Sequence, residues 1–493
     1  MDKLTQSFVK QLELYSQDDA SLFQQVITQV LGMDPGVQMF PGAQPVSLEP
    51  HKGLSDIVHT DYLACEKTDG TRFLLYLPPC NKNWLYTPES ITIERDYFYI
   101  DRAYSFRRAK GNLLLKGVCQ ALGITEAEVE AAITTDRQAT LAKRVNSFTL
   151  LFDGEVVQDT IAGKDVLAFY VFDSLIFINS TFALDLRKRL EIANRLPELL
   201  IHLSPEAIEF KTKVFYEKSQ IRELFRLIEA KELPHKSDGV IFTSVDEPYT
   251  PGTCHSIQKW KPLEQNTVDL CVKCSQERNT KLLTEAEYAC LLKDISRRRA
   301  EATDGSLMEA VQSAISPEAE KIVSELVKRP AATKNEAQLF LSQDRLLEPY
   351  PVDVMFLDDK KYAGLSKREQ DLYSRERALI LEVRWDKTKE TITYDDVSSL
   401  IFQYYPQLQR TCRSINIQRK RQGGWASVKP REDKERPNHR FVFESVCRSY
   451  DEHIDEETLC GILLGEIRLP NGGSPSQLSP YLLRPIRTPG YEY

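Results

Sequence analysis

Short apolar runs separated by polar turns dominate the chain from about residue 62 to residue 262. The runs at 73–77, 148–152 and 169–172 have the length of single strands and are bounded by polar or turn-forming residues. Residues 184–200 instead carry leucine and isoleucine at helical spacing. Because strands and helices do not alternate regularly, the pattern predicts an α+β fold over residues 1–262, built on antiparallel sheets.

The pattern changes after Pro262. Residues 266–273 predict a strand, and Thr284 and Ser316 mark two helix starts. A third helix is predicted over residues 336–347, and strand patterns resume near residues 352 and 379. This order predicts a β domain over residues 263–452 with a helical insertion at about 280–348. Residues 453–493 are expected to form a C-terminal helix and a loosely ordered tail.

Composition narrows the class of protein. Apolar residues make up 42% of the chain and charged residues 28%, which is typical of soluble globular proteins. The net charge of −8 argues against a protein that binds nucleic acid over its whole surface, although it permits a local basic cleft. No apolar run approaches a membrane span and the N-terminus lacks a signal-peptide pattern, so we expect no membrane association. Among the ten scattered cysteines, Cys271 and Cys274 lack the further ligands of a zinc site.

One lysine lies two residues before an Asp-Gly pair. Lys67 stands in the polar turn between the apolar runs at 62–64 and 73–77. An amine held in a sheet among other cations can lose its proton near neutral pH and attack a phosphorus atom. A simple hairpin turn is the alternative, and on this motif alone it is favoured.

Four downstream positions carry side chains suited to nucleotide chemistry. Glu155 follows Asp-Gly at the start of a strand, where its carboxylate can hold a divalent metal or a ribose hydroxyl. Phe172 ends an aromatic strand and can stack on a purine, although a core position is the commoner outcome. Lys259 and Lys261 point to the same face of a strand, so both can meet one polyphosphate.

Taken in order, these motifs resemble those of the GTP-dependent mRNA guanylyltransferases, the RNA capping enzymes of the covalent nucleotidyltransferase superfamily. The single-function fungal type is the most similar. The patterns KxDG, DGE, SDG(V/L)I, KWKP and RxDK occur at residues 67–70, 153–155, 237–241, 259–262 and 431–434. ATP-dependent DNA ligases and RNA ligases share several of them. The segments at 40–47 and 259–269 match the capping enzymes and separate the chain from the ligases.

The resemblance implies an antiparallel-sheet nucleotidyltransferase domain followed by a C-terminal OB-fold β-barrel domain. It implies that Lys67 is the nucleophile, that Phe172 stacks on guanine, and that Asp238 and Glu155 bind Mg²⁺ or Mn²⁺. The GTP-binding residues that it implies are Arg72, Arg95, Glu155, Phe172, Lys211, Lys259, Lys261, Arg431, Asp433 and Lys434.

The expected reaction transfers GMP from GTP, through a lysyl adduct, to the 5′-diphosphate end of RNA in the nucleus. The chain contains no His-Cys-x5-Arg phosphatase loop, so the RNA 5′-triphosphatase is expected to be a separate protein. The resemblance also implies association with the phosphorylated C-terminal tail of RNA polymerase II. An ATP-dependent polynucleotide ligase and a catalytically inactive RNA-binding scaffold remain the alternatives.

Overall fold

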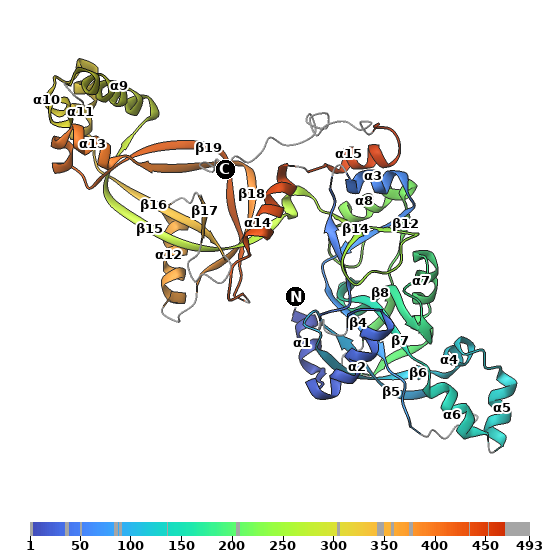
Figure 1. Ribbon diagram of the computed structural model, residues 1–493. Helices are drawn as coiled ribbons and strands as arrows, with labels where there is room; N and C mark the ends of the chain where they lie inside the picture. The colour runs from blue at the N-terminus through green and yellow to red at the C-terminus, as the bar shows by residue number, and fades with distance from the viewer. Residues whose placement is uncertain are drawn as a thin grey trace. The chain divides into compact units, whose positions relative to one another are not determined.

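The computed structural model describes most of the chain, in two compact units (Figure 1). One unit comprises the described residues up to Pro262 together with those after residue 452, and the other comprises Leu263–Asp451. The described residues are 3–34, 39–49, 52–82, 87, 91–135, 137–203, 208–302, 306–342, 350–355, 359–373, 378–432, 434–451 and 453–468.

A nine-stranded sheet forms the larger part of the first unit, in the order β1-β6-β5-β4-β7-β8-β11, with β10 on β6 and β9 on β8. Every pair in it is antiparallel except β11 with β8. The strands are β1 (Glu13–Leu14), β4 (Thr71–Leu77), β5 (Thr92–Ile100), β6 (Phe106–Leu114), β7 (Leu150–Ile161), β8 (Lys164–Phe177), β9 (Asn179–Ser180), β10 (Leu200–Leu203) and β11 (Ile208–Thr212).

Alternate residues of β4 fill two separate cores, because successive side chains of a strand point to opposite faces. Phe73 and Leu75 pack on one face and Leu74 and Tyr76 on the other, all buried. This explains the continuous apolar run at 73–77, since both faces of the sheet are covered. The helices that cover the two faces are α1 (Lys3–Gln11), α4 (Leu115–Ala121), α5 (Glu126–Thr134) and α6 (Gln138–Asn146) on the first and α2 (Gln17–Val30) on the second.

A second sheet of five strands has the order β12-β3-β13-β14-β2. Helices α3 (Lys52–His59), α8 (Ile221–Glu229) and α15 (Glu456–Leu463) share one apolar core with this sheet, and Figure 1 shows the three side by side. Trp260 anchors α15 by donating from Nε1 to the Ile454 carbonyl at 2.8 Å. The strands are β2 (Ala43–Ser47), β3 (Tyr62–Thr68), β12 (Tyr216–Glu217), β13 (Ser237–Ser244) and β14 (Gly252–Trp260).

The second unit is built on a sheet that closes on itself. Its order is β17-β16-β15-β18-β19, and β15 pairs with β19 as well as with β18. This double pairing of β15 is consistent with the OB-type barrel that the family resemblance implies, and the sheets and helices of the two units confirm the α+β class. The strands are β15 (Thr267–Leu283), β16 (Ala332–Leu341), β17 (Tyr350–Met355), β18 (Ile380–Asp396) and β19 (Ser414–Pro430), with helices α12 (Asp359–Tyr373) and α14 (Arg440–Asp451) beside them.

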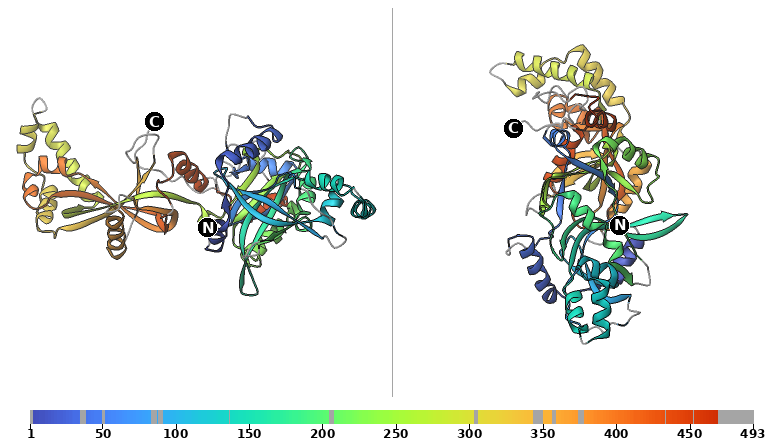
Figure 2. Two further views of the ribbon diagram at one scale, coloured as in Figure 1. Left: turned by 90° about the horizontal axis from the view of Figure 1, so that it is seen from below. Right: turned by 90° about the vertical axis from the view of Figure 1, so that its right-hand side faces the viewer.

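Three helices occupy the expected insertion, at one end of the long strands β15 and β19 (Figures 1 and 2). They are α9 (Glu285–Glu301), α10 (Leu307–Gln312) and α11 (Pro317–Lys328), and they share a core with α13 (Ser398–Tyr404). The two predicted helix starts are confirmed. Thr284 caps α9 in a capping box with Glu287, and Ser316 caps α11 by accepting from the Ala319 amide.

The third helix predicted at 336–347 is wrong over the residues that the structure describes. Residues Ala332–Leu341 form β16, which pairs antiparallel with β15. Ala337, Leu339 and Leu341 alternate into the barrel core, so pairing with a distant strand overrides the helical preference of the local sequence. No helix among the described residues is long and apolar enough to cross a membrane.

A buried histidine makes the stability of the first unit depend on pH. His202 is 6% exposed, and burial lowers its pKa to about 4. The unfolded chain binds this proton near pH 6.5 but the folded chain does not. We therefore expect up to about 3 kcal/mol of stability to be lost as the pH falls from 6.5 to 4. In urea unfolding at several pH values, His202→Gln should remove this part of the decline, and the exposed control His59→Gln should not. Equal pH dependence in both variants would contradict the assignment.

Candidate active site

One carboxylate joins two lysines on the five-stranded sheet. Lys67, in β3, donates from Nζ to Oδ1 of Asp238 at 2.6 Å, and Lys261 donates from Nζ to Oδ2 at 2.5 Å. All three side chains are 20–26% exposed, so solvent and substrate reach them. The two lysines and the aspartate come from three sequence motifs, and antiparallel pairing of β13 with β3 and β14 brings them together.

The glycine after Asp238 is required by this packing. Gly239 has φ +151, and a Cβ there would lie 2.1 Å from the Trp260 carbonyl oxygen. A register shift between Ser237 and Val240 occurs at the same place. The Asp-Gly pair therefore lets β13 approach β14 closely and present the Asp238 carboxylate to both lysines.

Further positive charge gathers beside this cluster. Lys259 is half-buried in β14, and burial, together with the charges of Lys261, Lys67 and Arg102, lowers its pKa below the ordinary lysine value. Asp238 partly offsets this shift. Four cations around one carboxylate form a site that suits a polyphosphate.

The nine-stranded sheet contributes a fixed arginine. Arg72, in β4, donates to Asp153 from Nε at 2.9 Å and from Nη2 at 2.5 Å, and from Nη1 to the Ala43 carbonyl at 2.5 Å. Tyr249 also donates to Asp153, at 2.5 Å. The guanidinium carbon lies 5.6 Å from the centre of the Phe172 ring. Arg72 is therefore held rigidly beside the aromatic side chain predicted to stack on a base.

A buried lysine that the sequence motifs did not include, Lys213, also lies near Phe172. The Nζ of Lys213 is 5.7 Å from the centre of the Phe172 ring, 4.0 Å from Oε2 of Glu155, and donates to the Thr68 hydroxyl at 2.6 Å. Burial raises the pKa of Glu155 although Lys213 opposes the shift. The structure thus brings Glu155 and Phe172 together, with Lys213 between them.

The predicted Lys211 lies two residues away from Lys213. Lys211 pairs with Asp159 at 2.8 Å and with Glu209 at 3.0 Å. Residues two apart in a strand point to the same face of the sheet, so Lys211 and Lys213 share a face. The Lys213 amide donates to the Val171 carbonyl and so extends the pairing of β11 with β8 by one residue. That periodicity is the signal by which Lys213 could have been found next to Lys211.

The structure does not bring Arg95 to this cluster. Arg95 is buried in β5 and donates from Nη2 to the Pro78 carbonyl at 2.6 Å. Pro78 follows the last residue of β4, whereas Arg72 lies near the first residue of that strand. Arg102, just after β5, is exposed and lies close enough to Lys259 to influence its pKa. The antiparallel register of β4 and β5 places residue 102, and not residue 95, at the Arg72 end.

The predicted phosphate-binding residues of the barrel unit share one acidic partner. Arg431 donates from Nη1 to both carboxylate oxygens of Asp269 at 2.9 Å, and Nζ of Lys434 is 3.9 Å from Asp269. Glu382 lies 3.7 Å from Arg431. Asp433 lies outside the described residues, and the roles of Arg431 and Lys434 stay predictions.

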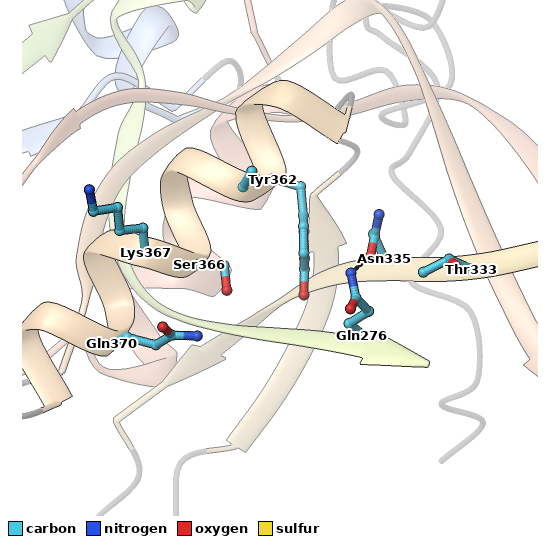
Figure 3. A pocket seen from close by; sticks show the side chains of 8 residues that line it. Gln276, Thr333, Asn335, Tyr362, Ser366, Lys367 and Gln370 are labelled. Carbon is cyan, nitrogen blue, oxygen red and sulfur yellow. Dashed lines mark hydrogen bonds between the residues drawn. The ribbon is translucent and has the colours of Figure 1, made fainter. Parts of the chain in front are cut away.

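A separate hollow of about 650 Å³ lies in the barrel unit between α12 and strands β15 and β16 (Figure 3). Gln276 and Asn335 lie on its strand side, Ser366 and Gln370 on its helix side, with Tyr362 between them. None of the residues predicted for nucleotide chemistry lines it, so we place the candidate active site in the first unit.

The described side chains supply too few ligands for a divalent metal ion, so substrate phosphates would have to complete its coordination. Among the described residues, no group of three or more His, Cys, Asp or Glu side chains is placed to hold a metal ion. Mg²⁺ is commonly bound by only one or two carboxylates together with substrate phosphates. Asp238 and Glu155 fit this smaller requirement.

Comparison with known proteins places these features in one family. Residues 5–263 match the family described as "mRNA capping enzyme, catalytic domain", and residues 318–460 match "mRNA capping enzyme, C-terminal domain". The chain is 30% identical over 278 residues to the mRNA-capping enzyme subunit alpha of Schizosaccharomyces pombe, covering 53% of this chain and 59% of the relative. It is 31% identical over 244 residues to the subunit alpha of Neurospora crassa, covering 47% and 52%.

The chain spans about half the length of the curated relatives it matches. Among solved structures, mycobacterial DNA ligase D complexed with ATP and MES aligns with 71% of this chain and 90% of its own, at 12% identity and a TM-score of 0.31.

Proposed function

Because the chain belongs to the mRNA capping enzyme family, we propose that it is an mRNA guanylyltransferase, which transfers GMP from GTP to the 5′-diphosphate end of RNA. The observation that best supports this proposal is the cluster in which Asp238 joins Lys67 to Lys261. It presents one amine beside an acidic group, within a site that collects positive charge.

In the first step Lys67 attacks the α-phosphorus of GTP. An ammonium group has no free electron pair, so Lys67 must first give up a proton, and Asp238, hydrogen-bonded to its Nζ, is placed to take it. The N–P bond forms, the bond from the α-phosphorus to the bridging oxygen breaks, and pyrophosphate leaves. The terminal oxygen of the RNA 5′-diphosphate then attacks the same phosphorus, the N–P bond breaks, and the GpppN cap is complete.

Charge neutralisation carries most of the catalysis of phosphoryl transfer. Lys259 and Lys261 contact the α-phosphate, and Arg431, Asp433 and Lys434 orient the β- and γ-phosphates as the leaving group. Asp238 and Glu155 would hold a Mg²⁺ or Mn²⁺ ion, which would supply positive charge at the attacked phosphate.

The surroundings of Phe172 favour guanine over adenine. In this proposal the base stacks on the Phe172 ring and its edge contacts the Lys213 ammonium, which can only donate hydrogen bonds. The Nζ of Lys213 lies 5.7 Å from the centre of that ring. Guanine offers a carbonyl oxygen at position 6, whereas adenine offers an amino group. This contact would select GTP, with Arg72 and Glu155 next to the ribose and phosphates.

Nucleotide preference tests this function directly. The purified chain is incubated with α-labelled GTP or α-labelled ATP and with Mg²⁺ or Mn²⁺, then analysed on a denaturing gel. We expect an acid-labile, alkali-stable labelled band with GTP alone. A band with ATP alone would assign the chain to the polynucleotide ligases, and no band with either nucleotide would favour the RNA-binding scaffold.

The family also suggests the setting of the reaction. We propose that a separate RNA 5′-triphosphatase supplies the 5′-diphosphate RNA, and that the chain works in the nucleus with the phosphorylated C-terminal tail of RNA polymerase II. The relatives carry the name "subunit alpha", which fits a division of capping between more than one chain.

A further inference from the structure

A group of buried polar side chains adjoins Lys213. His235, just before β13, bridges two carboxylates, with Nδ1 3.0 Å from Oδ1 of Asp159 and Nε2 3.3 Å from Oε1 of Glu66. The three side chains are 0–5% exposed. Buried carboxylates are costly unless hydrogen-bonded, so this bridge is an essential part of the local packing.

Each of the two carboxylates holds a further group. Asp159 accepts from Tyr170 at 2.8 Å and from Lys211 at 2.8 Å, so it keeps partners if the histidine is removed. Glu66 lies 3.8 Å from the Nζ of Lys213. Among the hydrogen bonds of the described side chains, the bond from His235 is the one that orients the Glu66 carboxylate.

The protonated imidazole suits this bridge, because only that form donates from both ring nitrogens. Burial opposes the positive charge, but the hydrogen bonds to Asp159 and Glu66 outweigh it and raise the pKa of His235 above the ordinary histidine value. The charged bridge also balances part of the negative charge of Glu66, which otherwise attracts Lys213 alone.

We infer that His235 is a positioning residue for nucleotide selection: it fixes Glu66, and Glu66 in turn fixes the Lys213 ammonium between Thr68 and the edge of the stacked base. This inference rests on the proposed guanylyltransferase function. Without the histidine, Glu66 lacks its donor and draws Lys213 away from Thr68. The contact to the 6-oxo group of the base then weakens, while Lys67 and its partners stay in place.

The inference is tested with GTP and two analogues, each of which lacks one group of the guanine base. GTP and inosine triphosphate both carry the 6-oxo group, and 2-aminopurine riboside triphosphate lacks it. In full-length His235→Ala we expect kcat/KM for adduct formation to fall about tenfold with the first two, mainly through KM, and to stay nearly unchanged with the third. His235→Gln, which keeps one amide donor, should fall between His235→Ala and the wild type.

The control variant is His59→Gln, an exposed histidine at the end of α3, which should behave as the wild type with all three nucleotides. An equal loss with all three nucleotides in the His235 variants, or no loss, would overturn the inference while leaving the proposed function intact. Unfolding of both His235 variants would assign the residue to stability and overturn it too. A wild-type chain that forms no adduct with GTP would overturn the proposed function itself.

Discussion

Replacing Lys67 by arginine should abolish labelling of the chain by α-labelled GTP. Arginine keeps the positive charge and can still pair with Asp238, so the surrounding packing should persist. A guanidinium group does not lose its proton in proteins, however, and so offers no electron pair to the α-phosphorus. The expected signal is the background of the gel. The matched control is Lys143→Arg on the exposed side of α6, which should be labelled as strongly as the wild type.

Mapping the labelled peptide completes this test. Digestion of the wild-type adduct should place GMP on the peptide that contains Lys67. Label on Lys213, Lys259 or Lys261, or full labelling of Lys67→Arg, would contradict the assignment of the nucleophile and move that role to another lysine of the site.

Changing the two cations of the barrel unit should separate the two steps of the reaction. Arg431→Ala and Lys434→Ala should each slow formation of the enzyme–GMP adduct about 10- to 100-fold, because each removes a contact to the leaving pyrophosphate. Transfer from a preformed adduct to 5′-diphosphate RNA should proceed at nearly the wild-type rate, since no pyrophosphate takes part in it.

The two rates are measured separately, with adduct accumulated by long incubation, freed of GTP, and then mixed with RNA. Lys420→Ala, on the exposed side of β19, is the control and should leave both rates unchanged. Equal losses in both steps would show that Arg431 and Lys434 act beyond the leaving group, and would contradict the proposed division of roles.

Three of the predicted site residues lie together in the structure, and they come from short sequence motifs, while their chemical roles stay predictions. Lys67, Asp238 and Lys261 each lie in or next to a strand, so strand periodicity gives the direction of the side chains except at Asp238, where the register shift beside Gly239 also matters. The double pairing of Asp238 follows once the three strands are neighbours. The capped helices α9 and α11 are likewise local features, whereas the barrel was expected from the family resemblance.

The features that the sequence did not predict depend on pairing between distant segments. The register of β4 with β5 places Arg102, and not Arg95, at the end of the sheet that carries Arg72, and the motifs alone do not show this. Lys213 follows β11, two residues after the predicted Lys211, and its place beside Glu155 likewise depends on pairing between distant strands. The helix predicted at 336–347 is a strand because β15 supplies its hydrogen bonds. His235 carried no signal of its own, since its partners Glu66 and Asp159 are 169 and 76 residues away in the chain.

The position of α15 has a consequence for how the protein is made. This helix follows the barrel unit in the chain, yet it completes the core over α3, α8 and Trp260 in the first unit. The ribosome therefore releases most of the nucleotide-binding unit long before the piece that covers its apolar face is synthesised. Residues 263–451 are therefore synthesised while the first unit still lacks α15. Until α15 is made, the apolar face over α3 and α8 is exposed and is a target for chaperones. A chain cut at Pro262 would keep every lysine of the candidate active site and still lack this cover.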